Sequence, residues 1–261
     1  NKLWQTEEME GIRVIRVGSY ITANEGFIRR TLDYMSFMVT GFLASLFVKR
    51  VDVVVGTSPQ FFTVCAAYMT GLCKQIPWVF ELRDIWPESI RAVGAIKSSK
   101  VLDKLERLEL FLYRKADAII SVTHAFRKNL IKRGVDGSKV HVITNGVDVN
   151  RFTPRNKDTE LVERFGLEDK FVAGYIGTHG MAHALETVLD AAEILKGEGY
   201  EDRFRIILLG DGANKVALKE YANSRGLDNV IFVDSVSKRE VVRLWSLLDV
   251  SIIHLKKTEL F

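Results

Sequence analysis

The amino-acid sequence predicts an α/β protein with two domains, each built around a parallel sheet. Short apolar runs rich in β-branched residues alternate with longer amphipathic runs along all 261 residues. This alternation is typical of strand–helix–strand units, whose strands lie parallel in one sheet. A polar stretch at residues 145–170 interrupts the pattern and opens on Asn145-Gly146, a turn signal. We therefore predict two Rossmann-like domains, residues 1–150 and 151–261, whose binding edges face one cleft.

In the first half, the strands are compact runs of Val and Ile, and the helices are longer runs with apolar residues at helical spacing. The predicted strands are 12–17, 51–56, 78–82, 118–123 and 140–144. The predicted helices are 27–49, 60–75, 99–116 and 124–133. Gly134, directly after Arg133, is a typical C-cap for the last of these helices.

The second half repeats the alternation after a charged stretch that we interpret as a linker. The predicted strands are 171–177, 204–210, 229–234 and 249–255. The predicted helices are 184–197, 213–225 and 237–248. Ser237 and Glu240 have the spacing of a capping box, in which each side chain accepts from the other residue's backbone N–H.

One apolar segment requires a test for membrane binding. Residues 34–48 carry no charge and are flanked by Arg29, Arg30, Lys49 and Arg50. The segment is shorter than the roughly 20 residues that span a bilayer. We interpret it as a buried helix of the first domain, with a helix that rests on a membrane surface as the alternative.

Composition narrows the class of protein without selecting a ligand. The net charge of +4 permits nucleotides, lipid phosphates or nucleic acid as partners. Cys65 and Cys73 lie two helical turns apart, too far for a disulfide in a straight helix, so we expect two buried thiols, as in a reducing cytoplasm. No secretory signal, metal-ligand spacing, P-loop or hydrolase elbow is present in the sequence.

A strand, a glycine-rich turn and a helix follow one another at residues 173–192. The apolar run ends at Gly177, the turn reads Gly177-Thr178-His179-Gly180, and a helical pattern opens near Leu185. Glycines let a ligand approach the backbone, and a helix N-terminus presents free N–H groups and partial positive charge. We therefore predict a phosphate site flanked by His179 and His183. The alternative for His183 is an ordinary place in the first helical turn.

A second glycine-rich turn follows the next strand, in LLGDGANK (208–215). Gly210, Asp211 and Gly212 form this turn, and Lys215 lies where its ammonium can point at a phosphate. The alternative for Lys215 is a solvated helix lysine. Neither turn matches GxGxxG, and no acidic residue ends this strand as a ribose ligand would, which argues against NAD.

Polar residues also follow the strands of the first half. Arg83 and Asp84 come directly after strand 78–82; an arginine can hold a phosphate or carboxylate, and an aspartate can accept a proton. The alternative is an ion pair that fixes the loop. Ser58 and His124 follow two other strands and are candidates for an acceptor pocket, with helix capping or a helix N-terminal position as the alternative.

Three blocks, FELRDIWPES (80–89), VITNGVDVNRF (142–152) and YIGTHGMAHALETVLDAA (175–192), resemble retaining glycosyltransferases of family 4, which have the GT-B fold. The closest resemblance is to bacterial enzymes that assemble O-antigen, colanic acid or capsule on a lipid carrier. It covers essentially the whole chain. It also implies that the chain is cut at both ends, since the family's opening strand and its Glu-x7-Glu motif are not matched.

The resemblance implies roles for individual residues. The Gly177–Gly180 turn is similar to the family's donor-diphosphate loop, and Lys215 resembles the basic residue that neutralises the leaving diphosphate. Asp234, Ser235 and Val236 lie in the stretch that resembles the loop framing the nucleotide base. Arg83 and Asp84 match catalytic and acceptor-side positions, and Asn145 belongs to an NGVD turn like that before the family's interdomain linker.

The resemblance implies transfer of a hexosyl or N-acetylhexosaminyl group to a lipid-linked glycan, without a metal ion or bound cofactor. It implies a UDP-sugar in preference to a GDP-sugar, no nucleic-acid partner, and a cytoplasmic protein with peripheral contact at the inner face of the cell membrane. Two alternatives stay open. One is a UDP-sugar 2-epimerase of GT-B fold, and the other is a non-catalytic nucleotide-binding scaffold of a polysaccharide assembly complex.

Overall fold

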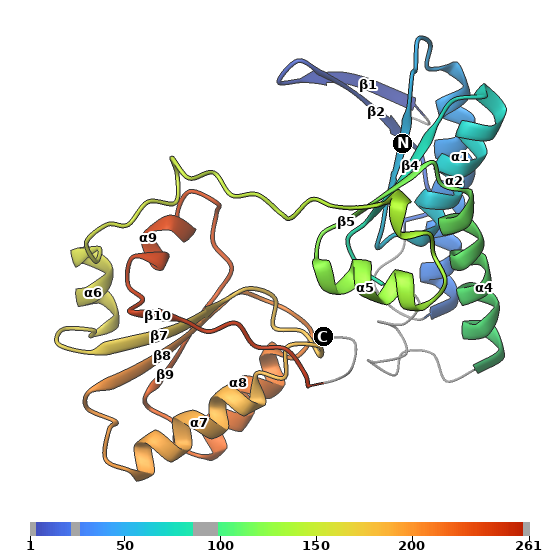
Figure 1. Ribbon diagram of the computed structural model, residues 1–261. Coiled ribbons are helices and arrows are strands. Elements are labelled where there is room, and N and C mark those ends of the chain that lie inside the picture. The colour runs from blue at the N-terminus through green and yellow to red at the C-terminus, as the bar shows by residue number, and fades with distance from the viewer. Residues whose placement is uncertain (1–3, 22–26, 86–98, 258–261) are drawn as a thin grey trace. The chain divides into compact units, whose positions relative to one another are not determined.

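The computed structural model describes residues 4–21, 27–85 and 99–257, and it divides the chain into two compact units (Figure 1). Unit 1 is Asn1–Asn145 and unit 2 is Gly146–Phe261. Each unit contains a four-stranded sheet in which every strand pair is parallel. The predicted α/β class with a parallel sheet in each half is therefore confirmed.

The sheet of unit 1 follows the order of the chain. Its strands lie in the order β3 (Val54–Thr57), β4 (Trp78–Leu82), β5 (Ala118–Ser121) and β6 (Val140–Val142). In β4, Trp78, Phe80 and Leu82 are buried and the residues between them are half-buried, because successive side chains of a strand point to opposite faces. All four strands end at one edge, which places the residues that follow them near one another.

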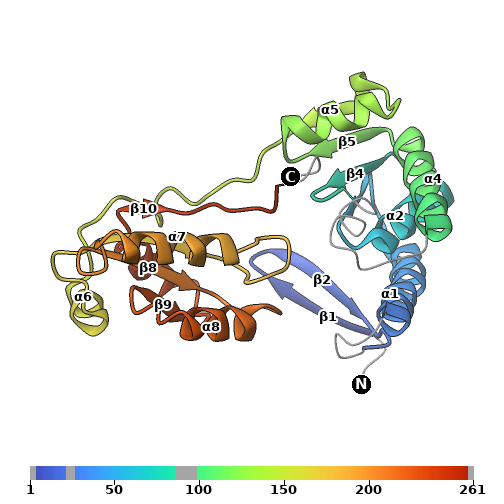
Figure 2. The same ribbon diagram turned by 90° about the horizontal axis from the view of Figure 1, so that it is seen from below.

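The described part of unit 1 contains four α-helices. They are α1 (Phe27–Phe47), α2 (Phe61–Lys74), α4 (Ser99–Lys115) and α5 (His124–Lys132). Helix α1 packs along α2 in both views, and the hydroxyls of Ser45 and Thr70 lie 2.7 Å apart between them (Figures 1 and 2). Among the described residues, no helix has the length and apolar character needed to cross a membrane.

The predicted strand 12–17 does not join the parallel sheet. It is β2 (Ile12–Val17), and it pairs antiparallel with β1 (Trp4–Met9) in a separate hairpin, which is seen clearly in Figure 2. The turn uses Glu10 and Gly11, both with positive φ, as a two-residue hairpin with matching twist requires. The strand was recognised from its Val and Ile content, but a β-branched run by itself does not specify its partner.

The thiols differ from the expectation of two buried cysteines. Cys73 is exposed, so the prediction is wrong for that residue. Cys65 is half-buried, and burial raises the pKa of its thiol to about 11. Both lie on α2, whose buried face carries Phe61 and Val64. Cys73 falls near the end of the helix and away from that face, which explains its exposure.

A buried acidic group joins α4 to the C-terminal end of α5. The Glu109 carboxylate accepts from the Tyr113 hydroxyl at 2.8 Å and from the Arg133 guanidinium at 2.6 Å, and its side chain is 1% exposed. Glu106 also faces Arg133, at 3.3 Å. Burial raises the pKa of Glu109 to about 7, while the charge of Arg133 opposes that rise.

In the sheet of unit 2, strands are added first on one side of the first strand and then on its other side. Its order is β10 (Val250–Ser251), β7 (Phe171–Ile176), β8 (Phe204–Leu209) and β9 (Val230–Val233). From β7 the chain moves outward to β8 and β9, and it then returns to place β10 on the other side of β7. In doubly wound sheets, ligands bind at such a switch point, beyond the carboxyl ends of the strands.

Helices cover both faces of this sheet. Helices α7 (Glu186–Gly197) and α8 (Lys215–Ser224) pack on one face, and α6 (Thr159–Phe165) and α9 (Val241–Trp245) on the other (Figure 1). Strand β8 serves both layers: Ile206 and Leu208 join the α7–α8 core, while Ile207 and Leu209 join the α6–α9 core. The nearly continuous apolar character of its sequence follows from burial on both faces.

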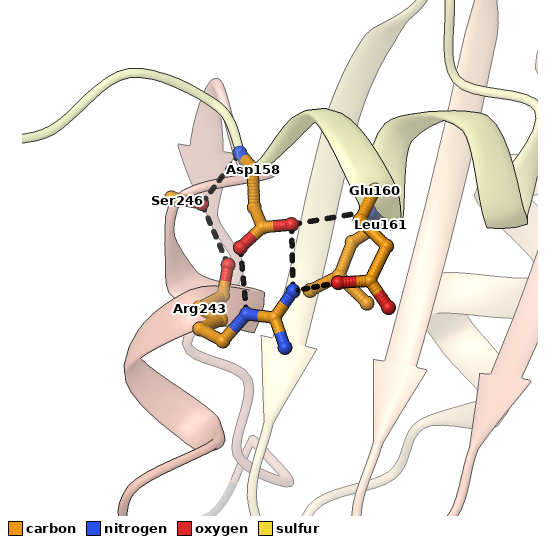
Figure 3. A network of polar contacts seen from close by, with 5 residues as sticks. All are labelled: Asp158, Glu160, Leu161, Arg243 and Ser246. Carbon is orange, nitrogen blue, oxygen red and sulfur yellow. Dashed lines mark hydrogen bonds and ion pairs between the residues drawn. The ribbon is translucent and has the colours of Figure 1, made fainter.

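Helix α6 lies inside the stretch that we interpreted as a linker. Asp158 caps it by accepting from the Leu161 N–H at 3.2 Å, and Gly166 ends it in the left-handed region. The Asp158 carboxylate also receives two hydrogen bonds from Arg243 of α9, at 2.6 and 2.9 Å (Figure 3). The signal was present as an Asp before a short amphipathic run that ends in Gly, but high charge concealed it.

The capping box of α9 is confirmed. The Ser237 N–H donates to the Glu240 carboxylate at 3.1 Å, and the Glu240 N–H donates to the Ser237 hydroxyl at 3.3 Å. Regular helix begins only at Val241 and ends at Trp245, so α9 is shorter than the predicted 237–248. Strand β10 is also shorter than predicted, because its regular pairing with β7 ends at Ser251.

We expect Glu109 to make the stability of the protein depend on pH. A carboxyl whose folded pKa is raised favours folding below its unfolded pKa, near 4.5, and loses that contribution as pH rises through about 7. Between about pH 5 and pH 8 the wild-type protein should therefore lose roughly 2 kcal/mol more stability than Glu109→Gln. Urea unfolding at the two pH values measures this difference. Glu106→Gln, which changes a more exposed neighbour of Arg133, should retain the wild-type pH dependence, and an equal loss in all three proteins would contradict the assignment.

Candidate functional site

The turns that follow β7 and β8 interlock through their backbones. The His179 N–H donates to the Asp211 carbonyl at 2.9 Å, and the His179 carbonyl accepts from the Asn214 N–H at 3.0 Å. The Gly210 N–H reaches the Val233 carbonyl of β9 at 3.0 Å, so the third strand end is joined to the other two. The predicted residues Gly177–Gly180 and Gly210–Gly212 are thus brought together at one edge of the sheet.

Two glycines in this crossing are required by the protein itself. A Cβ atom at Gly210 would lie 1.8 Å from the Gly177 carbonyl oxygen, and one at Gly212 would lie 2.5 Å from the His179 carbonyl oxygen. Both have a positive φ, +142° at Gly210 and +157° at Gly212. Their lack of a side chain therefore admits the neighbouring turn. Gly180 differs, since a Cβ there would make only ordinary contacts at 3.5 Å.

His179 lies fully buried in this crossing. Its side chain is 0% exposed, and neither ring nitrogen has a hydrogen-bond partner among the described residues. The ring lies edge-on to Phe232, with centroids 6.5 Å apart. Burial lowers the pKa of the imidazole, and the positive charge of Lys215 lowers it further. A neutral ring whose two nitrogens lack a partner is unusual in a protein interior, which makes His179 a candidate for contact with a ligand.

Lys215 is also buried, at 7% exposure, so the alternative of a solvated helix lysine is wrong. Its ammonium donates to the Gly210 carbonyl at 2.6 Å and to the Asp234 carboxylate at 2.5 Å. Asp234 is 86% exposed, and the hydrogen bond and charge of Lys215 hold the pKa of its carboxyl below the usual value. The positive charge is thereby fixed between the turns that end β8 and β9.

The remaining residues of these turns have mainly backbone contacts. The Thr178 carbonyl accepts from the Tyr175 hydroxyl at 2.9 Å, which ties the first turn to β7. The Asp211 carboxylate accepts from the Gly212 N–H at 2.8 Å. The His183 N–H donates to the Gly180 carbonyl at 3.1 Å, and the next residue, Ala184, has a positive φ of 42°.

The loop after β9 borders a hollow of about 440 Å³ in unit 2. Ser235 and Val236 line it beside Asp234, together with side chains from α6 and α9. Its lining includes Phe165 and Phe232, and Arg164 at the rim lies 5.4 Å from the Phe165 ring centroid. The predicted base loop therefore borders a recess in which two phenylalanines lie among charged and polar side chains.

One residue near the first turn was not singled out from the sequence. His254 Nδ1 lies 2.7 Å from the carbonyl oxygen of His183. The sequence analysis placed His254 inside a strand that extends to residue 255, whereas β10 ends at Ser251. The segment after Ser251 therefore leaves the sheet and lies beside the first glycine-rich turn. Its course depends on where the strand ends, which the sequence pattern did not show.

The predicted residues of unit 1 gather at the edge of its sheet. The Ser58 hydroxyl accepts from the backbone N–H groups of Arg83 at 3.0 Å and Asp84 at 3.4 Å, and Ser58 is 1% exposed. The Arg83 guanidinium donates to the Asn145 side-chain oxygen at 3.4 Å. His124 is exposed at the start of α5, whose N-cap is Thr123. The edge thus brings Ser58, Arg83, Asp84 and Asn145 together, while within the described ranges no hydrogen bond or ion pair joins His124 to them.

Residues 86–89 of the FELRDIWPES block lie outside the described residues. Within the described ranges, no group of three or more His, Cys, Asp or Glu side chains could hold a metal ion. The two sets of candidate residues belong to different units, one at each sheet edge.

Comparison with known proteins identifies sequence relatives. The profile of Glycosyltransferase Family 4 matches residues 4–151. WcaI of Escherichia coli (strain K12), named as a colanic acid biosynthesis glycosyl transferase, is 25% identical over 240 residues, covering 88% of this chain and 58% of WcaI. A GDP-mannose-dependent alpha-mannosyltransferase of Mycobacterium tuberculosis (strain CDC 1551 / Oshkosh) is 26% identical over 53% of this chain and 33% of its own length. The chain thus spans little more than half of WcaI.

Solved structures share the fold at low sequence identity. Sucrose-phosphate synthase of Thermosynechococcus elongatus superposes with a TM-score of 0.70 at 15% identity, over 97% of this chain and 62% of its own. Anabaena HepE, crystallised with UDP and glucose, gives a TM-score of 0.65 at 17% identity, over 90% of this chain and 60% of its own. At these identities the likeness establishes the fold alone, and the predicted GT-B fold is confirmed.

We expect the crossing of the two turns to tolerate no side chain at Gly210. Gly210→Ala would force a Cβ atom into the Gly177 carbonyl, and the variant should lose about 3 kcal/mol or more of stability in unit 2. Gly180→Ala is the matched control, and it should cost less than about 1 kcal/mol because its Cβ makes ordinary contacts. Urea unfolding of both variants measures the difference. Similar stabilities would show that the two turns are further apart than described.

Proposed function

The chain belongs to glycosyltransferase family 4, and from this premise we propose that it transfers a sugar from a nucleotide-sugar donor to a lipid-linked glycan in surface polysaccharide biosynthesis. The donor is a UDP-sugar in preference to a GDP-sugar, and the transferred group is a hexosyl or N-acetylhexosaminyl unit. The reaction retains the configuration at the sugar's anomeric carbon. One observation carries the proposal: a buried histidine without partners among the described residues, beside a buried lysine, at the switch point of the unit 2 sheet.

The donor diphosphate is assigned to the interlocked turns of unit 2. Negative charge grows on this group as the sugar leaves, so groups that are already fixed before the reaction stabilise the transition state most effectively. Lys215 supplies a positive charge held by two hydrogen bonds, and His179 supplies a ring nitrogen without a partner among the described residues. We assign Gly177–Gly180, His183 and Gly210–Gly212 to the same subsite, and we propose that the leaving diphosphate is neutralised without a metal ion.

The nucleotide base is assigned to the recess beside the β9 loop. Its lining includes Phe165 and Phe232, which offer apolar and aromatic surface to a flat heterocycle. Asp234 belongs to both places, since it lines the recess and contacts Lys215. The recess and the turns thus share one loop, which supports a ligand that carries both a base and phosphates.

The acceptor is assigned to the edge of unit 1. Arg83 and Asp84 are proposed as the groups nearest the reaction, with Ser58 and Asn145 holding them and His124 further along the same edge. Ser58 would act through the backbone of the loop after β4, because it is buried and its hydroxyl is bonded there. A retaining front-face reaction requires no strong protein nucleophile, and none is assigned.

Contact with a membrane is proposed through α1. Leu32, Val39 and Leu43 are 51, 50 and 50% exposed and lie seven and four residues apart, so they form one apolar stripe along this helix. Exposed Lys49 follows the helix and can meet anionic lipid. This contact would keep a cytoplasmic protein at the inner face of the membrane, beside a lipid-linked acceptor.

We expect this chain to bind UDP more tightly than GDP, as measured by isothermal titration calorimetry. Lys215→Met keeps the buried apolar stem but removes the charge, and it should weaken UDP binding by about 10-fold or more, equivalent to roughly 1.4 kcal/mol. Lys219→Met removes an exposed lysine one turn further along α8 and should change the affinity by less than about 2-fold.

Unchanged affinity in Lys215→Met would contradict the phosphate assignment, and absence of UDP and GDP binding would contradict the function. A transfer assay on the natural protein, with and without a chelator, then separates an enzyme from a nucleotide-binding scaffold. Release of a 2-epimerised UDP-sugar instead of a glycosylated lipid would favour the epimerase.

A further inference from the structure

The segment after β10 is joined to the loop that carries His183. His254 Nδ1 lies 2.7 Å from the His183 carbonyl oxygen. A carbonyl only accepts hydrogen bonds, so Nδ1 carries the proton and Nε2 is the unprotonated nitrogen whenever the ring is neutral. The contact therefore selects one tautomer and fixes the orientation of the imidazole.

Backbone contacts on both sides of His254 hold the segment along its length. The Ile252 N–H donates to the Gly174 carbonyl of β7 at 2.7 Å, and the Lys256 N–H donates to the Ala182 carbonyl at 2.8 Å. The segment therefore follows the chain from β7 past the first glycine-rich turn. It lies on the β10 side of the switch point, opposite the side on which β8 contributes the second turn.

The loop that receives these contacts contains a strained residue. Ala184 has a φ of 42°, in the left-handed region that residues with a Cβ seldom adopt. Such a conformation is unfavourable and persists where neighbouring contacts hold it in place. The carbonyl groups of Ala182 and His183, directly before Ala184, are the two that the β10 segment binds.

We propose that His254 is a positioning residue of the donor site. Its Nδ1–H holds the His183 carbonyl, which keeps the strained loop in the conformation that presents His183 and the Gly177–Gly180 turn to the donor diphosphate. The inference rests on the proposed function, because it assigns His254 to the same site. Through this hydrogen bond, the segment after β10, on the far side of the switch point, controls donor affinity.

Asparagine and glutamine distinguish the two ring nitrogens. The side-chain N–H of Asn can occupy the place of Nδ1, whereas that of Gln reaches the place of Nε2. We expect His254→Asn to bind UDP within about 2-fold of wild type, while His254→Gln and His254→Ala bind about 10-fold more weakly, a difference in line with one lost hydrogen bond. His141→Asn, in β6 of unit 1, is the control and should leave the affinity unchanged.

Calorimetric titration with UDP measures all five proteins, and thermal unfolding shows whether each variant is folded. If Gln retains affinity and Asn loses it, His254 contacts the ligand through Nε2 and the positioning role is wrong. Equal affinities in all variants overturn the inference while the proposed function stands. If wild type fails to bind UDP or GDP, the proposed function itself fails. If a His254 variant unfolds at a lower temperature than wild type, Ala184→Gly is added to that variant. Glycine relieves the strain at residue 184, so part of the affinity should return if His254 acts through this loop.

Discussion

The close crossing of two backbone turns is the constraint on which the candidate donor site depends. The turn after β8 lies so near the turn after β7 that a Cβ atom at Gly210 would meet the Gly177 carbonyl oxygen at 1.8 Å. Reciprocal backbone hydrogen bonds between His179, Asp211 and Asn214 hold the crossing together. Since these contacts involve the main chain, the edge is rigid before any ligand arrives, which is the condition for efficient charge stabilisation.

The charges at this edge follow from the same crossing. His179 is enclosed by it, which lowers the pKa of the imidazole and leaves both ring nitrogens without a partner among the described residues. Lys215 is buried beneath it and bonded to the Gly210 carbonyl, so its ammonium cannot swing freely into solvent. Asp234 balances that charge from the exposed side. The crossing therefore holds a neutral imidazole and a fixed cation at one edge of the sheet, an arrangement that supports the proposed binding of an anion.

Local sequence patterns predicted the strands and turns but not every partner. Alternating apolar runs identified the parallel strands, because a strand that is buried on one or both faces carries apolar residues at its buried positions. The hairpin of β1 and β2 was missed because β1, with the mostly polar sequence WQTEEM, lacks the apolar run by which the other strands were recognised. Helix α6 was missed because its charges resemble those of a linker, although Asp158 and Gly166 are ordinary caps. The roles of Gly210 and His254 depend on which turns cross in space, which no single segment reveals.

The central claim is that the interlocked turns of unit 2 bind the donor diphosphate, and amide chemical shifts of ¹⁵N-labelled protein test it most directly. On titration with UDP, the account predicts that the largest shifts fall on the amides of Gly177–Gly180 and Gly210–Gly212, with smaller shifts at Ser235 and Val236 beside the recess. Shifts confined to residues outside these turns, or no shifts at saturating UDP, would contradict it.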